Sequence, residues 1–366
     1  MKTDKIPNFY HDKPLFGLDI GHGSLKVMQL TEPPFDVDLK GYRPKVVGYG
    51  FTSFDKSAQD NGVVVQPEII AKAAHKLFKD GLVGNINSRR VAVAIPAYRT
   101  FTRALELPKL QAKELEEAVE LEAEQYISMP LEELYLDYKV VRQTETDIEL
   151  FVVAVPRKIV DSYVDLTQIL GLEAILIEPT LSSSGRLFSI GDTSNEPAFI
   201  IDFGTLSCDI SVFDKDILVT GTVVQGGGAN FTNAIKSKLD VTLEEAGLIK
   251  TRYGLGASKR QKEIEEALAP TLGLIVKEIR RMLRYYEERY GQERPIKQII
   301  TLGGGANMPG LSEYLTSVLR MAVRHFDPWQ YFNFKGLDPP SVADRPMYAI
   351  AAGLSLAHPK EVFKHD

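Results

Sequence analysis

Short apolar runs alternate with amphipathic stretches along the chain. In the first half this pattern predicts strands at 16–30, 45–51, 91–95, 136–141, 149–155 and 174–177, and helices at 67–78, 112–126 and 158–170. In the second half it predicts strands at 217–224 and 298–302, and helices at 231–239, 270–290 and 311–319. The helices are assigned where apolar residues recur every three or four positions. Strands that alternate with helices in this way are typical of an α/β protein.

One segment of the first half recurs in the second. FGLDIGHGSLKVMQL begins at Phe16 and FIIDFGTLSCDISVF begins at Phe199, and the two align without a gap. They lie 183 residues apart (199 minus 16), half the chain, whereas solenoid repeats have periods of 20–50 residues. We therefore expect two related domains. The alternative is that each copy is an ordinary β-hairpin with an Asp-Gly turn.

Each copy predicts a strand, a tight glycine turn and a second strand. Asp19 stands near the end of the first strand, and Gly21 and Gly23 permit the turn. Backbone N–H groups in such a turn can hold a phosphate. The pentapeptide Gly-Gly-Gly-Ala-Asn occurs at 226–230 and at 303–307, each time between a predicted strand and a predicted helix. A glycine turn that leads into a helix N-terminus also suits anions and nucleotides.

Composition narrows the function classes. The chain has 366 residues with 43 Lys and Arg against 49 Asp and Glu, a net charge of −6, which argues against broad nucleic-acid binding. The single Cys208 excludes an internal disulfide and a multi-cysteine zinc site, and its place in a strand favours a packed residue over a nucleophile. The apolar runs span about six residues and the N-terminus has no signal-peptide pattern. We expect a cytoplasmic protein without direct membrane insertion.

Five motifs together resemble the actin-like ATPase superfamily, which includes actin, the seventy-kilodalton chaperones, sugar kinases and FtsA. DIGHGSLKV and DFGTLSCDI resemble its two phosphate motifs, TLGGGANMPGL its adenosine motif, and IEPTLSSSGRL and PMYAIAAGLSLA its connecting segments. The resemblance implies a bilobal α/β fold of duplicated RNase H-like domains with a small inserted α+β subdomain in the first half.

The resemblance also implies a division of the chain. We expect a flexible arm at 1–13, a first actin-like domain at 14–98 that is completed by 174–196, an inserted subdomain at 99–173, a second domain at 197–340 and a connecting helix and tail at 341–366.

Three stretches in or beside the expected insertion resemble the type IV pilus assembly protein family PilM. They are RALELPKL, LEAEQYISMPLEELYLDYKVV and VPRKIVDSYVDLTQILGLEAILIEP. The resemblance implies a cytoplasmic scaffold, recruited to the inner face of the inner membrane, that binds the N-terminal cytoplasmic tail of the inner-membrane protein PilN. Pilus motor or platform proteins are further expected partners.

The resemblance assigns a candidate site for ATP or ADP with Mg²⁺. Asp19 and Asp202 are expected to face each other across a cleft and to hold the metal through water, as suits this hard cation. Glu178 is the candidate catalytic residue, near the metal and the attacking water. The expected nucleotide contacts are Gly21, His22, Gly23, Ser24, Lys26, Gly204, Thr205, Gly226, Gly227, Lys250, Gly303, Gly304, Gly305 and Met308.

Two departures from the superfamily pattern lower the expected activity. His22 stands where relatives usually have a small residue, and Gly247 where they often have a glutamate that contacts the ribose. Loss of one charge-assisted hydrogen bond costs about 1.5–3 kcal/mol, so we expect nucleotide binding with weak or no hydrolysis. The chain would then be at most a slow ATPase.

Two other functions stay open. An FtsA-like division protein is expected to end in an amphipathic membrane helix, which the polar tail HPKEVFKHD does not resemble. A small-molecule kinase of the same fold would need a general base, for which Asp202, Asp209 and Glu178 are available. The aromatic stretch from Phe326 to Phe334 is either a packed loop or a docking surface.

Overall fold

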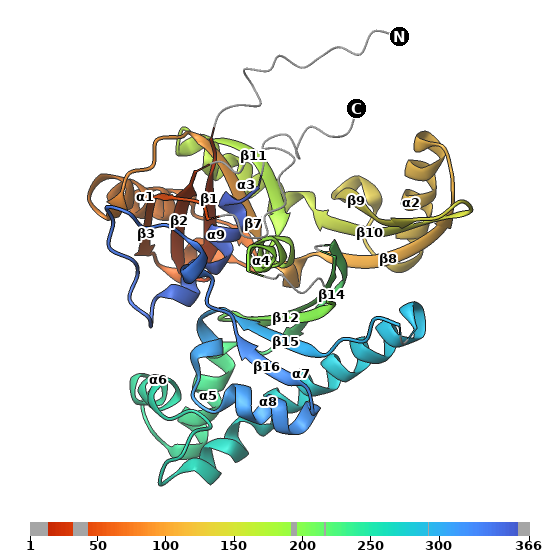
Figure 1. Ribbon diagram of the computed structural model, residues 1–366. Coiled ribbons are helices and arrows are strands. Elements are labelled where there is room, and N and C mark those ends of the chain that lie inside the picture. Colours follow the sequence, from red (N-terminus) through yellow and green to blue (C-terminus); the bar gives the residue numbers. More distant parts are fainter. Residues whose placement is uncertain (1–13, 32–42, 192–195, 216, 292, 358–366) are drawn as a thin grey trace. The chain divides into compact units, whose positions relative to one another are not determined.

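The computed structural model describes residues 14–31, 43–191, 196–215, 217–291 and 293–357 (Figure 1). The arm expected at 1–13 and the tail after 357 lie outside this part of the chain. The described residues form two compact units. Of the described residues, the first unit takes 14–31, 43–99, 156–191 and 328–357, and the second takes 100–155, 196–215, 217–291 and 293–327. The domain boundaries expected from the sequence stay predictions.

The first unit contains a six-stranded sheet in the order β11-β7-β1-β2-β3-β6. Its strands are β1 (Phe16–Gly21), β2 (Ser24–Leu30), β3 (Val46–Ser53), β6 (Leu82–Gly84), β7 (Arg90–Ile95) and β11 (Glu173–Pro179). Its helices are α1 (Pro67–Asp80), α3 (Arg157–Ile169), α4 (Thr180–Ser189) and α9 (Ala349–Ser355). A small hairpin of β4 (Gln59–Asp60) and β5 (Val63–Val64) completes the unit.

The second unit contains a five-stranded sheet in the order β14-β13-β12-β15-β16. Its strands are β12 (Ala198–Phe203), β13 (Ser207–Asp214), β14 (Ile217–Gln225), β15 (Gln298–Leu302) and β16 (Ala322–His325). Its helices are α5 (Gly228–Leu239), α6 (Leu243–Arg252), α7 (Gln261–Tyr290) and α8 (Leu311–Leu319).

The two sheets share one topology. In each, the first three strands run antiparallel to their neighbours, β1-β2-β3 in the first unit and β12-β13-β14 in the second. Two further strands then extend the sheet parallel to the first strand, β7 and β11 in one unit and β15 and β16 in the other. The α/β class and the repeated hairpin are thus confirmed, because chance resemblance of two hairpins would not reproduce five strands in the same order.

A three-stranded sheet and one helix interrupt the first half. The strands β8 (Phe101–Pro108), β9 (Leu134–Gln143) and β10 (Asp147–Pro156) lie in the order β8-β10-β9, and α2 (Ala112–Tyr126) packs its Leu115 and Val119 in their core. These residues belong to the second unit. The hydroxyl of Thr102 donates to the carbonyl of Gly221 in β14 at 3.2 Å, and the buried Glu149 accepts from Arg289 near the end of α7 at 2.9 Å.

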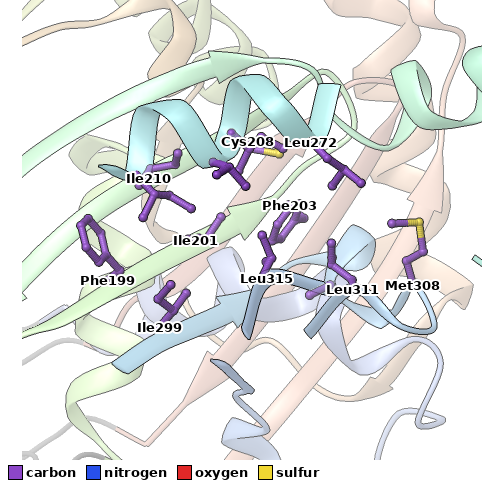
Figure 2. Close-up of a cluster of buried hydrophobic side chains, with 14 of the residues drawn as sticks. Phe199, Ile201, Phe203, Cys208, Ile210, Leu272, Ile299, Met308, Leu311 and Leu315 are labelled. Atoms are coloured by element: carbon purple, nitrogen blue, oxygen red, sulfur yellow. The ribbon is translucent and has the colours of Figure 1, made fainter. Parts of the chain in front are cut away.

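The core of the second unit lies between its sheet and its helices. Figure 2 shows side chains from β12 and β13 meeting Leu272 of α7, while Leu311 and Leu315 approach from α8. Cys208 has no exposed surface and belongs to this core, so its expected role as a packed residue is confirmed.

The long helix α7 begins earlier than predicted, at Gln261 instead of Pro270. An interior proline removes one backbone hydrogen bond and costs about 3 kcal/mol. The turns before it nevertheless stay helical because Ile264 and Leu268 are buried in the core. Burial of two large apolar side chains contributes about 3–6 kcal/mol, which offsets the proline.

The aromatic stretch is packed. Phe326, Trp329 and Phe332 are all buried. In the first unit, the ring of Trp329 makes edge contacts with Phe332 at 5.6 Å and Tyr348 at 6.1 Å between centroids. Of the two alternatives left open by the sequence, a packed loop is therefore the correct one for these three rings.

Candidate functional site

The first glycine turn joins β1 to β2. Gly21 pairs with Ser24 at the end of the hairpin, and His22 and Gly23 make the turn itself. Gly23 has φ +85°, a left-handed conformation that glycine adopts without strain. The turn thus forms where the repeated motif predicted it.

Below this turn, Asp19 and Lys26 form an ion pair. They are cross-strand partners in the hairpin, and the Lys26 ammonium donates to the Asp19 carboxylate at 3.0 Å. Both side chains are 11% exposed, so the pair is largely shielded from water. A Cβ atom on Gly21 would lie 2.8 Å from the ammonium. Lys26 therefore lies under the turn with its charge already balanced by Asp19.

His22 is partly buried in the turn. Burial lowers its pKa, and the positive charge of Lys56 lowers the pKa further. Since the ordinary pKa is 6.5, the imidazole is neutral at pH 7. Neutral imidazole can donate one hydrogen bond to a phosphate oxygen and does not add charge.

The second glycine turn joins β12 to β13 and is tied to the start of α5. The backbone N–H of Gly228 donates to the carbonyl of Gly204 at 2.9 Å, and that of Ala229 donates to Thr205 at 2.9 Å. A Cβ on Gly227 would come within 2.6 Å of the Thr205 carbonyl carbon. A glycine is therefore required where the two segments meet, and Gly204, Thr205, Gly226 and Gly227 are brought together as the motif implied.

Lys250 of α6 completes this cluster. Its ammonium donates to the carbonyl of Gly228 and to the hydroxyl of Thr232, both at 2.9 Å. Burial lowers the pKa of Lys250. The side chain holds α5 and α6 together beside the second turn.

The third glycine segment follows β15 and lies against β12. Gly303 has φ +78°, and a Cβ there would collide with the Asp202 carboxylate and come within 2.8 Å of the Phe203 carbonyl oxygen. A Cβ on Gly305 would meet the Phe203 side chain at 2.8 Å. Glycine at these positions lets β15 end directly beside Asp202. Gly304 has open space around it, whereas Met308 is 5% exposed and packs in the core.

Asp202 has a second carboxylate opposite it. The β12–β13 register pairs Asp202 with Asp209, and each is 8% exposed. Directly opposed residues on antiparallel strands have Cβ atoms about 4.5–5.5 Å apart. The hydroxyl of Ser207 donates to Asp209 at 3.2 Å. From the sequence, Asp209 is expected only as a possible base for a kinase and is not part of the expected metal site.

The repeat itself contains the signal for Asp209. It stands 183 residues after Lys26, the partner of Asp19, so the repeat exchanges a lysine for an aspartate at this position (209 minus 26). The first unit pairs a carboxylate with an ammonium, and the second pairs two carboxylates. Two carboxylates fit a divalent cation that keeps several waters. Among the described residues, no group of three or more His, Cys, Asp or Glu side chains surrounds a metal position.

Glu178 is engaged in the first unit. Both of its carboxylate oxygens accept from the Arg186 guanidinium of α4, at 2.7 and 2.8 Å, and the same guanidinium donates to the Gly353 carbonyl of α9 at 3.1 Å. Glu178 is 8% exposed. The bidentate pair joins β11, α4 and α9. These bonds give Glu178 a structural role, and its catalytic role stays a prediction.

Comparison with known proteins now identifies the family. A family model described as type IV pilus assembly protein PilM matches residues 17–358, a range that includes both glycine turns and the insertion. The chain belongs to the PilM family. A solved PilM-PilN type IV pilus biogenesis complex matches with a TM-score of 0.79 and 22% identity, covering 94% of this chain and 98% of the other.

Other matches share the actin-like fold. MreB 5 of Spiroplasma citri, solved with AMPPNP bound, matches with a TM-score of 0.51 and 12% identity over 96% of both chains. Cell division protein FtsA of Bacillus subtilis (strain 168) is 24% identical over 255 residues, which cover 60% of this chain and 57% of that protein. The match to FtsA thus spans little more than half of its length. Within the described ranges of this PilM family member, no helix is long and apolar enough to cross a membrane.

Proposed function

We propose that the chain is a nucleotide-binding scaffold of type IV pilus assembly. The observation that carries the proposal is the PilM family match over 17–358, together with a phosphate-type glycine turn beside a buried aspartate in each unit. The ligand is ATP or ADP with Mg²⁺. The partner is the N-terminal cytoplasmic tail of PilN, and the place of action is the inner face of the inner membrane.

The two turns have different electrostatic roles in this proposal. In the first unit the Asp19–Lys26 pair has no net charge, and the turn offers backbone N–H groups and the Ser24 hydroxyl to phosphate oxygens. In the second unit Asp202 and Asp209 supply the negative charge that a hydrated Mg²⁺ requires. When bound, this ion would neutralise phosphate charge, and Asp19 stays a candidate to hold one of its waters, as the family resemblance implies.

The adenosine part of the nucleotide is proposed to bind at the third glycine segment, which follows β15. Gly303 and Gly304 present backbone there, and Gly304 leaves room for a ribose or base. Met308 acts from within the core by supporting the segment, since its side chain is buried. Lys250 fixes the start of α5 beside the second glycine turn, where the backbone N–H groups of Gly228 and Ala229 donate to that turn.

Slow hydrolysis follows from the state of Glu178. Both of its oxygens accept hydrogen bonds from Arg186, an arrangement that favours a structural ion pair over a general base. We propose that nucleotide binding serves mainly to close the protein and to change its affinity for PilN. The free energy that couples nucleotide binding to PilN binding cannot exceed the difference in nucleotide affinity between the open and closed states.

PilN as the partner is supported by the match to the solved PilM-PilN complex, which covers 98% of the matched chain in that complex. The type IV pilus role rests on the family. Motor or platform proteins of the pilus are proposed as further partners. The FtsA-like alternative is less well supported, because that match covers 57% of FtsA. Nothing about the site favours a small-molecule kinase over a scaffold.

Two binding measurements test the proposal. Titration calorimetry with Mg-ATP compares the wild type, Asp202→Asn and a control, Asp137→Asn, whose aspartate is exposed on β9. We expect Asp202→Asn to weaken binding at least tenfold and the control to bind like the wild type. Equal affinity for all three would refute the metal half of the site.

The second measurement uses a labelled peptide of the PilN cytoplasmic tail and a scrambled peptide, each with and without Mg-ATP. We expect specific binding whose affinity changes with nucleotide. Nucleotide binding without any peptide binding would remove the scaffold role and leave a nucleotide-binding protein of another kind.

A further inference from the structure

The side chain of Lys56 lies against the first glycine turn. After β3 ends at Ser53, the backbone N–H of Phe54 donates to the carbonyl of Gly23 at 3.1 Å and holds the following segment beside the turn. A Cβ on Gly23 would lie 2.8 Å from Cγ and 3.4 Å from Cε of Lys56. The aliphatic part of the lysine therefore packs over the Gly23 backbone, and the ammonium follows one bond beyond Cε.

Lys56 is exposed, and its ammonium has no carboxylate partner in an ion pair across the described residues. The adjacent Asp55 carboxylate instead accepts from the backbone N–H of Ser57 at 2.9 Å, where it caps the short helix at Lys56–Ala58. The hydrogen bond of the Asp55 carboxylate is therefore to the short helix that it caps and not to the Lys56 ammonium.

The two lysines near this turn consequently differ. Lys26 lies beneath it, shielded from water, with its charge cancelled by Asp19. Lys56 packs against Gly23 and is open to solvent, and its positive charge adds to the effect of burial, which lowers the pKa of His22. An anion that accepts hydrogen bonds from the turn would also lie close to the positive charge of Lys56.

We propose that Lys56 is a further phosphate-binding residue, which contacts the oxygens of a phosphate chain held at the Gly21–Gly23 turn. The inference rests on the proposed nucleotide site and extends it to a residue outside both phosphate motifs. Lys56 supplies the positive charge to the ligand, and Lys26 neutralises Asp19. The contact requires phosphate charge, so it favours ligands with a phosphate chain over adenosine.

The expected loss of affinity on removal of Lys56 follows from the type of hydrogen bond that it would make. A hydrogen bond to a charged group, once lost, lowers affinity roughly tenfold to a hundredfold. Because Lys56 is exposed, added salt screens its interaction, and the difference between wild type and variant should shrink as the salt concentration rises. Lys56→Arg keeps the charge and should retain most of the affinity.

The chain offers a matched control at Lys335. This lysine is also exposed, and its neighbour Asn333 pairs with Lys45 just before β3 begins. β3 has eight residues and ends at Ser53, so Lys45, just before its start, lies about 26 Å from Ser53 at the usual strand rise. Lys335→Gln removes the same charge from the same unit at the far end of β3.

The test is calorimetric titration of the full chain with Mg-ATP, inorganic tripolyphosphate and adenosine at several KCl concentrations. The proteins are wild type, Lys56→Gln, Lys56→Arg and Lys335→Gln, each checked for an unchanged melting temperature. We expect Lys56→Gln to bind Mg-ATP and tripolyphosphate at least tenfold more weakly at low salt, with Lys56→Arg and Lys335→Gln close to wild type.

The outcomes separate this inference from the proposed function. Wild-type binding of Mg-ATP with equal affinity in Lys56→Gln overturns the role of Lys56 and leaves the nucleotide function in place. Binding of tripolyphosphate that Lys56→Gln weakens, without binding of Mg-ATP, supports Lys56 and overturns the nucleotide function. If the wild type binds neither Mg-ATP nor tripolyphosphate, both are overturned.

Discussion

Removal of the Glu178 carboxylate should destabilise the first unit strongly. Glu178 and Arg186 are joined by two charge-assisted hydrogen bonds of 2.7 and 2.8 Å, with side chains 10% and 17% exposed. When one partner of a buried pair is deleted, the other charge stays buried, at a cost of about 3–5 kcal/mol. In Glu178→Ala, the Arg186 guanidinium would keep its bond to Gly353 and lose both bonds to the carboxylate.

The corresponding change in melting temperature can be estimated. A unit of about 150–250 residues shifts by about 2–4 °C per kcal/mol, so Glu178→Ala should lower the transition of the first unit by roughly 6–20 °C. The assay is differential scanning calorimetry, with the two units fitted as separate transitions because they need not unfold together. Asp137→Ala, at an exposed position, is the control and should change little.

A double-mutant cycle then isolates the pair. It uses Glu178→Gln, Arg186→Met and the double variant. We expect a coupling free energy of about 2–3 kcal/mol, the upper part of the range for residues in contact. A coupling below about 0.5 kcal/mol would refute the conclusion that this ion pair stabilises the junction of β11, α4 and α9. In that event a loss of ATPase activity in a fully stable Glu178→Gln would favour the catalytic role.

Two further predictions concern packing and acid stability. Gly353→Ala places a Cβ within 2.7 Å of the Ser183 carbonyl carbon, so α4 and α9 must separate, and we expect a loss of about 1–3 kcal/mol in urea unfolding. Gly273→Ala in α7, where a Cβ has open space, is the control and should be neutral or more stable by up to about 1 kcal/mol. For His22, the folded pKa lies below the unfolded value of 6.5, so the unfolded chain binds more protons at mildly acidic pH. Stability from this group is present above pH 6.5 and is lost as the pH falls below that value and through the lower folded pKa. His22→Asn should therefore flatten the acid side of the stability profile measured by urea unfolding between about pH 7 and 5, and an unchanged slope would contradict the lowered pKa.

Several elements were predictable because their signals are local. The helix expected at 112–126 has those bounds in the structure, and the helix expected at 67–78 ends two residues later, at Asp80. Amphipathic spacing sets both segments without help from distant residues, and a proline at the first helical position also marks the start of the helix at Pro67. The short strands β6 and β16 were missed, because three or four residues carry too little periodicity to mark a strand.

The sequence by itself determined the α/β class, the repeated hairpin, the two glycine turns and the family, since each is written in contiguous residues. Tertiary structure decided which distant side chains meet. It placed Arg186 on both oxygens of Glu178, Asp209 opposite Asp202, and Lys56 against Gly23. The pairing of Asp202 with Asp209 depends on strand register, and a shift of one residue would turn either side chain to the other face of the sheet. The contacts of Arg186 and Lys56 depend on where α4 and the segment after β3 pack. No local pattern fixes that register; the packing of the complete core does.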